Sequence, residues 1–234
     1  MKVFQLTLLM MFSLFGLCAQ RSLQIEAGDY NRNNTPISFP YTGKKNISLR
    51  NQESGELVPV IKDFSGTYWF LLDEPLAARQ TRSYKIVKQP KSENAKPLSA
   101  EQVVLKAKDA PIVTYQVKTQ YPAKGRPDYY KRSGFFHPLL TPNGIVLTDP
   151  FPAGHEHQHG VFMTWVNTTF RGRKTDFWNQ QQQSGTVRVT DEQVRQTQQG
   201  GITILEDELA HVAIDETKSE TVVLKEWQSI RTYP

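Results

Sequence analysis

The fold is decided by the stretch TVVLKEWQSIRTY, residues 221–233, close to the end of the sequence. β-Branched and aromatic residues are frequent in it, which favours a long β-strand over a helix. Successive side chains of a strand point to opposite faces, so Val223 and Trp227 share one face and Leu224 and Ile230 share the other. A strand that is apolar on both faces requires neighbours on both sides. Only one residue follows the stretch, and we therefore expect a truncated domain that lacks the next strand.

Short apolar runs of the same kind recur along the chain. They are rich in β-branched and aromatic residues and are bounded by Gly, Pro, Asn or Asp, which is typical of strands separated by turns. The predicted strands are 57–61, 67–72, 83–87, 112–118, 144–148, 160–167, 185–190, 201–206, 208–214 and 221–233. Helical periodicity is almost absent. The pattern therefore predicts an all-β protein, an antiparallel β-sandwich.

Residues 1–19 have the features of a secretory signal peptide. Lys2 precedes an apolar stretch that ends at Leu17, and Ala19 precedes the expected cleavage site. We therefore expect a periplasmic or secreted protein. Cys18 makes a lipoprotein the alternative, but Leu17 stands where lipid attachment requires a small residue. The mature chain contains no later stretch that could span a membrane.

A polar stretch at residues 91–99 lacks apolar periodicity and is interpreted as a linker. It divides the mature chain into a small N-terminal β-module, residues 20–90, and a larger β-sandwich domain, residues 100–234. The formal net charge of +5 is scattered along the chain and forms no basic stripe. This distribution argues against a nucleic-acid partner.

Three of the five histidines lie in the run FPAGHEHQHG, residues 151–160. If this run is extended, His155, His157 and His159 share one face. Imidazole titrates near neutral pH and is a common metal ligand, so the run predicts an acid/base or sugar-binding pocket or a metal site, with a solvated loop as the structural alternative. We take His155 and His157 as candidate catalytic residues, because opening a sugar ring or an elimination needs a proton donor and a base near neutral pH.

Asp176 is the third candidate catalytic residue. It lies beside Phe177 and Trp178, and a carboxylate against apolar rings can have a raised pKa. Arginine offers fork-shaped hydrogen bonds, and tryptophan offers a ring on which a sugar can stack. The candidate substrate-binding residues are His137, Arg132, His159, Trp165 and Trp178. His211 stands in an alternating apolar and polar run and is interpreted as ordinary strand surface.

A divalent metal, if one is bound, would be held by His155, His157 and His159. This makes a cupin-like, metal-dependent enzyme an alternative, since a catalytic zinc site usually has three protein ligands. A cupin motif places Glu a few residues after His-x-His, and Val161 and Phe162 follow the run here instead. We therefore expect no obligatory cofactor and keep a divalent metal as the alternative.

Three motifs resemble those of the secreted PmoA-like family of unknown function, which is often labelled "methane oxygenase PmoA". They are KRSGFFHPLLTPNG at residues 131–144, the histidine run, and TDFWN at residues 175–179. The family often shows Asp-His-x-His-His-Arg-Gly at the histidine run. This chain has Gly154, Gln158 and His159 where the family has Asp, His and Arg, so the hydrogen-bonding partners there differ.

The resemblance covers about residues 110–234 well. It implies an exported bacterial protein, often encoded among carbohydrate-utilisation genes, with a fold similar to the galactose-mutarotase-like supersandwich. It does not imply oxygenase chemistry, since the methane monooxygenase subunit of that name is an integral membrane protein. It also implies further chain beyond residue 234.

Three hypotheses of function follow. The first is an exported protein that acts on or binds a carbohydrate or another small molecule through a His-rich acid/base or sugar-binding site; an enzyme of this kind would be an isomerase, lyase or hydrolase. The second is the metal-dependent, cupin-like enzyme. The third is a noncatalytic glycan-binding module. A cleft joining His155, His157, Arg132 and Asp176 would favour the first, and a flat aromatic surface far from the histidines would favour the third.

Overall fold

The computed structural model describes residues 22–43, 46–89, 96–190 and 194–234. These residues form antiparallel β-sheets joined by turns, with two short 3-10 helices, η1 (Asp128–Tyr130) and η2 (Gln180–Gln182). The predicted all-β, antiparallel sandwich is therefore confirmed. The predicted signal peptide lies outside the described residues. Neither of the two helices has the length and apolar character that crossing a membrane would require.

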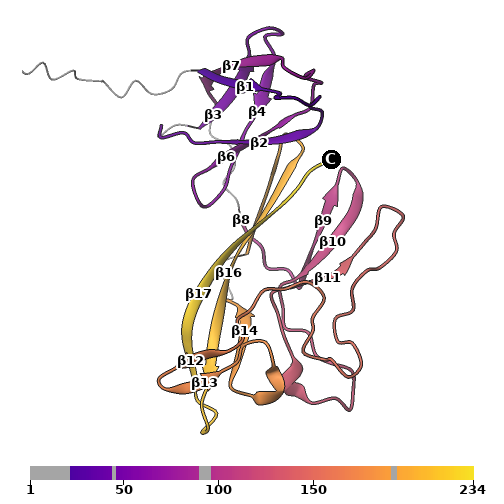
Figure 1. The fold of residues 1–234 in the computed structure, drawn as a ribbon, viewed down its shortest axis with the longest axis vertical. Coiled ribbons are helices and arrows are strands. Elements are labelled where there is room, and N and C mark those ends of the chain that lie inside the picture. The colour runs from indigo at the N-terminus through magenta and orange to yellow at the C-terminus, as the bar shows by residue number, and fades with distance from the viewer. Residues whose placement is uncertain (1–21, 44–45, 90–95, 191–193) are drawn as a thin grey trace, which may run out of the picture.

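The N-terminal strands form two sheets, at the upper end of Figure 1. The first sheet contains, in spatial order, β1 (Ser22–Glu26), β7 (Thr81–Lys88), β3 (Ile47–Asn51) and β4 (Leu57–Pro59). The second contains β2 (Thr35–Phe39), β6 (Tyr68–Leu72) and β5 (Ile61–Lys62). Side chains from both sheets pack into one core, so these strands form a small β-module.

Aromatic rings are prominent in the core of this module. Phe39, Phe70 and Tyr84 are buried, and the ring of Phe70 packs edge-on against that of Tyr84 with centroids 5.2 Å apart. Alternate residues of a strand share a face, which is why single inward positions of β2, β6 and β7 meet here. Each fully buried side chain of this size contributes about 1.5–3 kcal/mol to folding.

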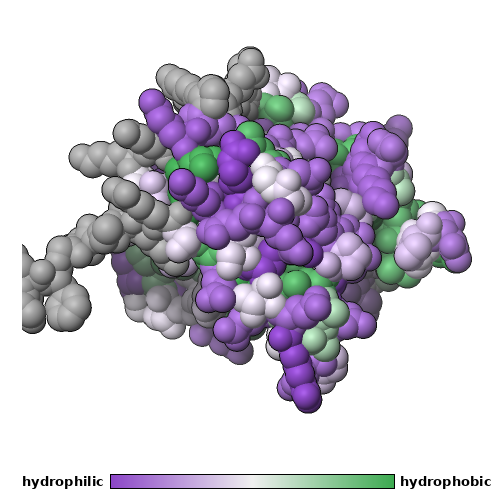
Figure 2. Space-filling model, turned by 90° about the horizontal axis from the view of Figure 1, so that it is seen from above, coloured by the Kyte–Doolittle hydropathy of each residue, from purple (hydrophilic) through white to green (hydrophobic). Residues whose placement is uncertain are grey.

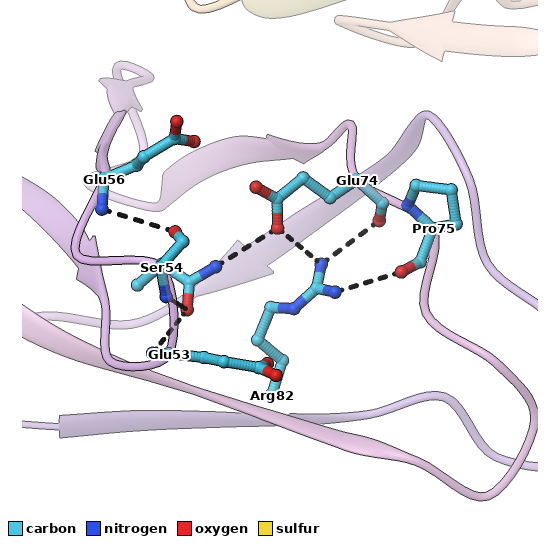
Figure 3. A network of polar contacts seen from close by, with 7 residues as sticks. Glu53, Ser54, Glu56, Glu74, Pro75 and Arg82 are labelled. Atoms are coloured by element: carbon cyan, nitrogen blue, oxygen red, sulfur yellow. Dashed lines mark hydrogen bonds and ion pairs between the residues drawn. The ribbon is translucent and has the colours of Figure 1, made fainter.

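A polar network beside the core links β7 to the segment that follows β6, at Glu74 and Pro75 (Figure 3). The Arg82 guanidinium donates hydrogen bonds to the carbonyl oxygens of Glu74 and Pro75, at 3.2 and 3.0 Å, and forms an ion pair of 3.2 Å with the Glu74 carboxylate. Asn51 donates a further bond to this carboxylate, and its own side-chain oxygen accepts one from the backbone of Glu53. The side chain of Arg82 is 11% exposed, so water competes little for these bonds.

We expect Arg82→Ala to lower the free energy of unfolding by about 1.5–3 kcal/mol, the range for hydrogen bonds that involve a charged group. The measurement is urea unfolding followed by circular dichroism. Lys118→Ala is the control, because its ion pair with Glu101 is exposed on both sides and should contribute at most about 1 kcal/mol. Equal losses in the two variants would contradict a role for burial in the Arg82 network.

The chain continues into a second group of strands. One sheet has the order β11 (Phe135–Leu139), β10 (Ala110–Gln116) and β9 (Gln102–Ala107). A larger sheet is built on β16 (Ile202–Ile214), which pairs with β17 (Glu220–Thr232) along one edge and with β14 (Gly185–Val189) and β15 (Arg195–Gln199) along the other. β8 (Lys96–Pro97) pairs with β15, and a small hairpin contains β12 (Thr168–Phe170) and β13 (Arg173–Thr175).

The β9–β11 sheet and the sheet built on β16 pack on each other as a sandwich. Leu105 of β9 and Tyr115 of β10 share a buried cluster with Leu205 of β16. A neighbouring cluster contains Val187 of β14 and Leu209 of β16. The face of β16 that carries Leu205 and Leu209 is therefore the inner face of the sandwich.

The β16–β17 hairpin runs along the molecule and reaches the N-terminal module (Figure 1). Ile202 and Ile204 of β16 pack with Ile61 of β5. Arg231, near the end of β17, forms an ion pair of 2.7 Å with Asp63. The two groups of strands are thus in direct contact, and the predicted boundary at residues 91–99 stays a prediction.

Two predicted strands are wrong. Residues 144–148 and 160–167 form loops that contain only isolated bridge residues, Val146 and Val161, among the described residues, although Leu147 and Thr148 also hydrogen-bond to β11. Ile145 and most other apolar side chains of these loops are exposed, so their apolar composition does not reflect burial in a sheet. The predicted strands 201–206 and 208–214 are one continuous strand, β16.

Seen from the N-terminal end, the visible surface is mostly hydrophilic (Figure 2). Hydrophobic residues appear there as small separate patches among hydrophilic ones. Scattered apolar residues of this kind are normal on a folded protein and mark no binding surface.

Candidate functional site

The histidine run forms two consecutive turns, and the prediction of an extended segment is wrong. His155 N donates to Pro152 O at 2.9 Å, and Gln158 N donates to His155 O at 2.8 Å. Gly154 and Gly160 adopt positive φ angles of 80° and 67°, a conformation that glycine reaches without a Cβ penalty. The three imidazoles therefore do not share one face.

His159 is buried in the sandwich. Its Nδ1 lies 3.0 Å from Pro150 O and its Nε2 lies 2.5 Å from Gln180 Oε1, while the rings of Phe135 and Phe162 pack around it. Burial lowers the pKa of His159 to about 4, while the hydrogen bonds to Gln180 and Pro150 act in the opposite direction. Both nitrogens are occupied within the protein. This placement contradicts the predicted roles of His159 in substrate binding and metal binding.

His155 and His157 remain a pair near the surface. Their ring centroids lie 6.0 Å apart, with His155 exposed and His157 partly buried. Burial and the neighbouring His155 lower the pKa of His157, while Glu156 and Asp176 act in the opposite direction. The described residues contain no group of three or more His, Cys, Asp or Glu side chains arranged to hold a metal ion.

Asp176 has a well-defined structural role. Its carboxylate accepts hydrogen bonds from the backbone of Trp178 and Asn179, at 2.9 and 2.8 Å, and from the Asn179 side chain at 2.9 Å. Although burial acts in the opposite direction, these bonds hold the pKa of Asp176 below its usual value. The predicted raised pKa is wrong, because the aromatic neighbours are outweighed by donors that stabilise the charged form. Trp178 packs on Phe162 and is only partly exposed.

His137 and Arg132 also lie inside the sandwich rather than on an open surface. His137 belongs to β11, and its Nδ1 lies 3.0 Å from Thr148 Oγ1; burial lowers its pKa. Arg132 is 2% exposed, and its guanidinium lies 4.5 Å over the ring of Phe162. Burial lowers the pKa of Arg132 to about 10, which leaves it charged at neutral pH. None of its three guanidinium nitrogens has a hydrogen-bond partner among the described residues.

Trp165 is the predicted substrate-binding residue that the structure leaves most exposed, at 60%. It lines a cleft of 470 Å³ between the loop after the histidine run and the β16–β17 hairpin. The loop is held by a hydrogen bond of 3.0 Å from Phe177 N to Trp165 O. We call this the Trp165 cleft; its lining residues are Met163, Thr164, Trp165, His211, Leu224, Lys225 and Glu226.

The Trp165 cleft is lined by an imidazole, His211, and a carboxylate, Glu226, which were not among the predicted site residues. His211 Nε2 lies 2.8 Å from Glu226 Oε2. His211 is 1% exposed, so its interpretation as strand surface is wrong. Its Nδ1, like the hydroxyl of Thr164, is buried without a partner among the described residues. Buried polar atoms are nearly always hydrogen-bonded, so these two atoms are exceptions.

The inner face of the hairpin carries a second polar group beside the cleft. Asp207 pairs with Gln228 in the strand register, two positions from the pair of Leu209 with Glu226, so all four side chains lie on this inner face. The hydroxyl of Tyr115 donates to the Asp207 carboxylate and accepts from Gln228 at 2.8 Å. Burial raises the pKa of Asp207 to about 6.

The structure therefore brings together a different set of residues from the predicted one. Of the predicted residues, only Trp165 lines the cleft, and His155, His157 and Asp176 do not. The polar residues of the cleft, His211 and Glu226, come from the paired strands β16 and β17. The long strand at 221–233 was predicted from the sequence, but its pairing and register with β16 were not, and the register places these two side chains side by side.

Together these features define an all-β protein whose C-terminal sandwich holds a largely apolar cleft beside a long hairpin, with His211 and Glu226 in its lining. A comparison with protein families matches residues 102–234 to the family of unknown function DUF6807, and the chain belongs to this family. The match covers the histidine run and every residue of the Trp165 cleft. Comparisons with curated proteins and with solved structures found no significant match. The resemblance to the PmoA-like family stays a prediction.

Proposed function

We propose that this protein is exported and binds or acts on a carbohydrate in the Trp165 cleft. The observation that carries the proposal is the conjunction of an exposed tryptophan with a partly exposed carboxylate, Glu226, that is hydrogen-bonded to the buried His211. Sugars present apolar C–H faces, which stack on an aromatic ring, and hydroxyl groups, which need donors and acceptors. The cleft offers both at one place, and its volume of 470 Å³ falls within the range of small-molecule sites.

The His211–Glu226 pair also supports acid/base chemistry. The Glu226 carboxylate is the group of the pair that a ligand can reach, since its side chain is 26% exposed, and the hydrogen bond to the buried His211 orients it. An isomerase, lyase or hydrolase needs such a group near the reacting hydroxyl. His155 and His157 lie outside the cleft lining, with their ring centroids 6.0 Å apart.

We expect Trp165→Ala to weaken binding of a neutral sugar at least about tenfold, which corresponds to about 1.4 kcal/mol of lost stacking and contact. The measurement is isothermal titration calorimetry with a panel of neutral mono- and disaccharides. Trp227→Ala is the matched control, since Trp227 is 57% exposed and does not line the cleft. The proposal fails if no sugar of the panel binds, or if both tryptophan variants lose affinity equally.

The same samples separate an enzyme from a noncatalytic glycan-binding module. After incubation, chromatography of each bound sugar shows whether it has been isomerised, cleaved or left unchanged. New product that disappears in Glu226→Gln would assign acid/base catalysis to the cleft. Binding without product in the wild-type protein would assign the noncatalytic role.

A further inference from the structure

A second hollow lies beside β14, and none of its lining residues also lines the Trp165 cleft. Its volume is 410 Å³, and residues of η1, η2 and β14 contribute to its walls. We call it the β14 pocket. Side chains that carry charge are frequent around it: Lys131, Arg132, Arg188, Lys218, Asp128 and Glu220.

Cations outnumber carboxylates in the β14 pocket. Arg188 is paired with Glu220 at 2.6 Å. Lys218 donates to the neutral side chain of Gln183, and Lys131 lies 6.0 Å from the centre of the Tyr121 ring. Within the described part of the chain no carboxylate pairs with either lysine. The pocket therefore holds positive charge that an anion would neutralise.

Arg132 adds a buried charge to the floor of the pocket. It is 2% exposed, and all three guanidinium nitrogens are buried and lack a hydrogen-bond partner among the described residues. A buried cation without hydrogen bonds is costly, so a structure retains it only where something compensates. Glu226 interacts with it electrostatically, but Glu226 is already hydrogen-bonded to His211. The ring of Phe162, whose centre lies 4.5 Å from the guanidinium carbon, compensates part of the charge, and an anion in the β14 pocket would add to this compensation at longer range.

The remaining walls of the pocket suit a polyhydroxylated ligand. Tyr121 is 60% exposed and offers a ring face, and Tyr129 lies beside it in the lining. Ser133 and Thr186 contribute hydroxyl groups, and Gln183 contributes an amide. Aromatic faces with hydroxyl and amide groups recognise sugar rings, and the lysines add recognition of a negative group.

We propose that the β14 pocket binds a small anionic sugar, one that carries a carboxylate or a sulfate group. The anionic group lies toward Lys131 and Lys218, above the buried charge of Arg132, and the sugar ring packs on Tyr121. This site goes beyond the proposed function, because its residues are separate from the Trp165 cleft and it binds ligand whether or not that cleft does.

The test is calorimetric titration of the purified protein with glucuronate, glucose 6-sulfate, glucose and inorganic sulfate at low and high salt. We expect one or both anionic sugars to bind at least tenfold more tightly than glucose, with affinity falling as salt increases. If glucuronate and glucose 6-sulfate bind with different affinities, the tighter one identifies the negative group that the pocket recognises. Equal binding of glucose by the Trp165→Ala variant, in which the other cleft is disabled, or no binding of either anionic sugar, overturns the proposal. Inorganic sulfate binding as tightly as the sugars also overturns it.

Variants locate the site. The double variant Lys131→Ala/Lys218→Ala and the variant Arg132→Met should each bind the anionic sugar at least tenfold more weakly. Thermal unfolding confirms that the variants fold. Lys85→Ala/Lys106→Ala is the control, since it removes the same charge as the lysine pair from exposed positions outside the pocket. Loss of affinity in the control to the same extent overturns the proposal. Trp165→Ala should leave the affinity unchanged; if it abolishes binding, the ligand occupies the Trp165 cleft, which overturns this inference and supports the proposed function.

Discussion

Gly160→Ala is expected to lower the free energy of unfolding by about 2–5 kcal/mol, the sum of left-handed strain and overpacking. Gly160 closes the histidine run with a φ of 67°, and a Cβ built on it would lie 2.3 Å from the carbonyl oxygen of Phe136. That oxygen belongs to the backbone of β11 and accepts from Val161 N, so it cannot move aside as the end of a flexible side chain would. The substitution would therefore displace the loop from the strand.

Gly154→Ala in the same run is the matched control. Its φ of 80° is also positive, but a Cβ there would have nothing within 4 Å, so only the backbone strain of about 1–2 kcal/mol applies. Denaturant unfolding of both variants separates the two contributions. Equal losses would show that the close approach of Gly160 to β11 does not exist in solution.

Asp207→Asn is expected to raise the free energy of unfolding at pH 8 by up to about 3 kcal/mol, since a shift of one pKa unit corresponds to about 1.4 kcal/mol. Burial raises the pKa of Asp207 from 3.8 to about 6. The folded protein therefore holds a proton that the unfolded chain releases. This contribution to stability is fully present below pH 4 and is lost as the pH rises through 6, whereas asparagine carries no charge at either pH.

The measurement is chemical unfolding of both proteins at several values between pH 4 and pH 8. Subtracting the two curves cancels the other titrating groups and leaves the contribution of Asp207. The difference should be small at pH 4 and should grow as the pH rises. Asp109→Asn, an exposed substitution, should show no such trend. A constant difference at every pH would refute the raised pKa of Asp207.

The alternation of apolar residues predicted the fold class and the long strands correctly. β6, β7, β10, β14, β16 and β17 fall at or near their predicted positions. The predictions at 144–148 and 160–167 failed because apolar residues such as Ile145 and Met163 are exposed on loops. The strands β1, β2 and β3 were missed because they are short and carry few aromatic residues, so that their pairing with distant strands decides their conformation.

The candidate site was harder to predict than the fold. The histidine run was a clear signal, yet its three imidazoles have different environments: His155 is exposed, His157 is partly buried, and His159 is in the core. A loop containing glycine and proline does not follow the strand alternation on which the prediction depended. His211 gave no signal of its own, because a single histidine within an apolar strand is equally compatible with surface and core.

The sequence alone predicted that the chain is all-β, that residues 221–233 form a long strand, and that histidine, tryptophan and arginine are available for a site. These properties depend on local alternation and composition, which are readable without knowing any contact. The tertiary structure was needed to show that His211 is hydrogen-bonded to Glu226 in the cleft that Trp165 also lines. It also showed that His159 lies in the core next to Gln180, and that Arg132 is buried without a hydrogen bond among the described residues. These facts depend on strand register and on the packing of residues distant in the chain, and a shift of one residue would reverse which face each side chain occupies.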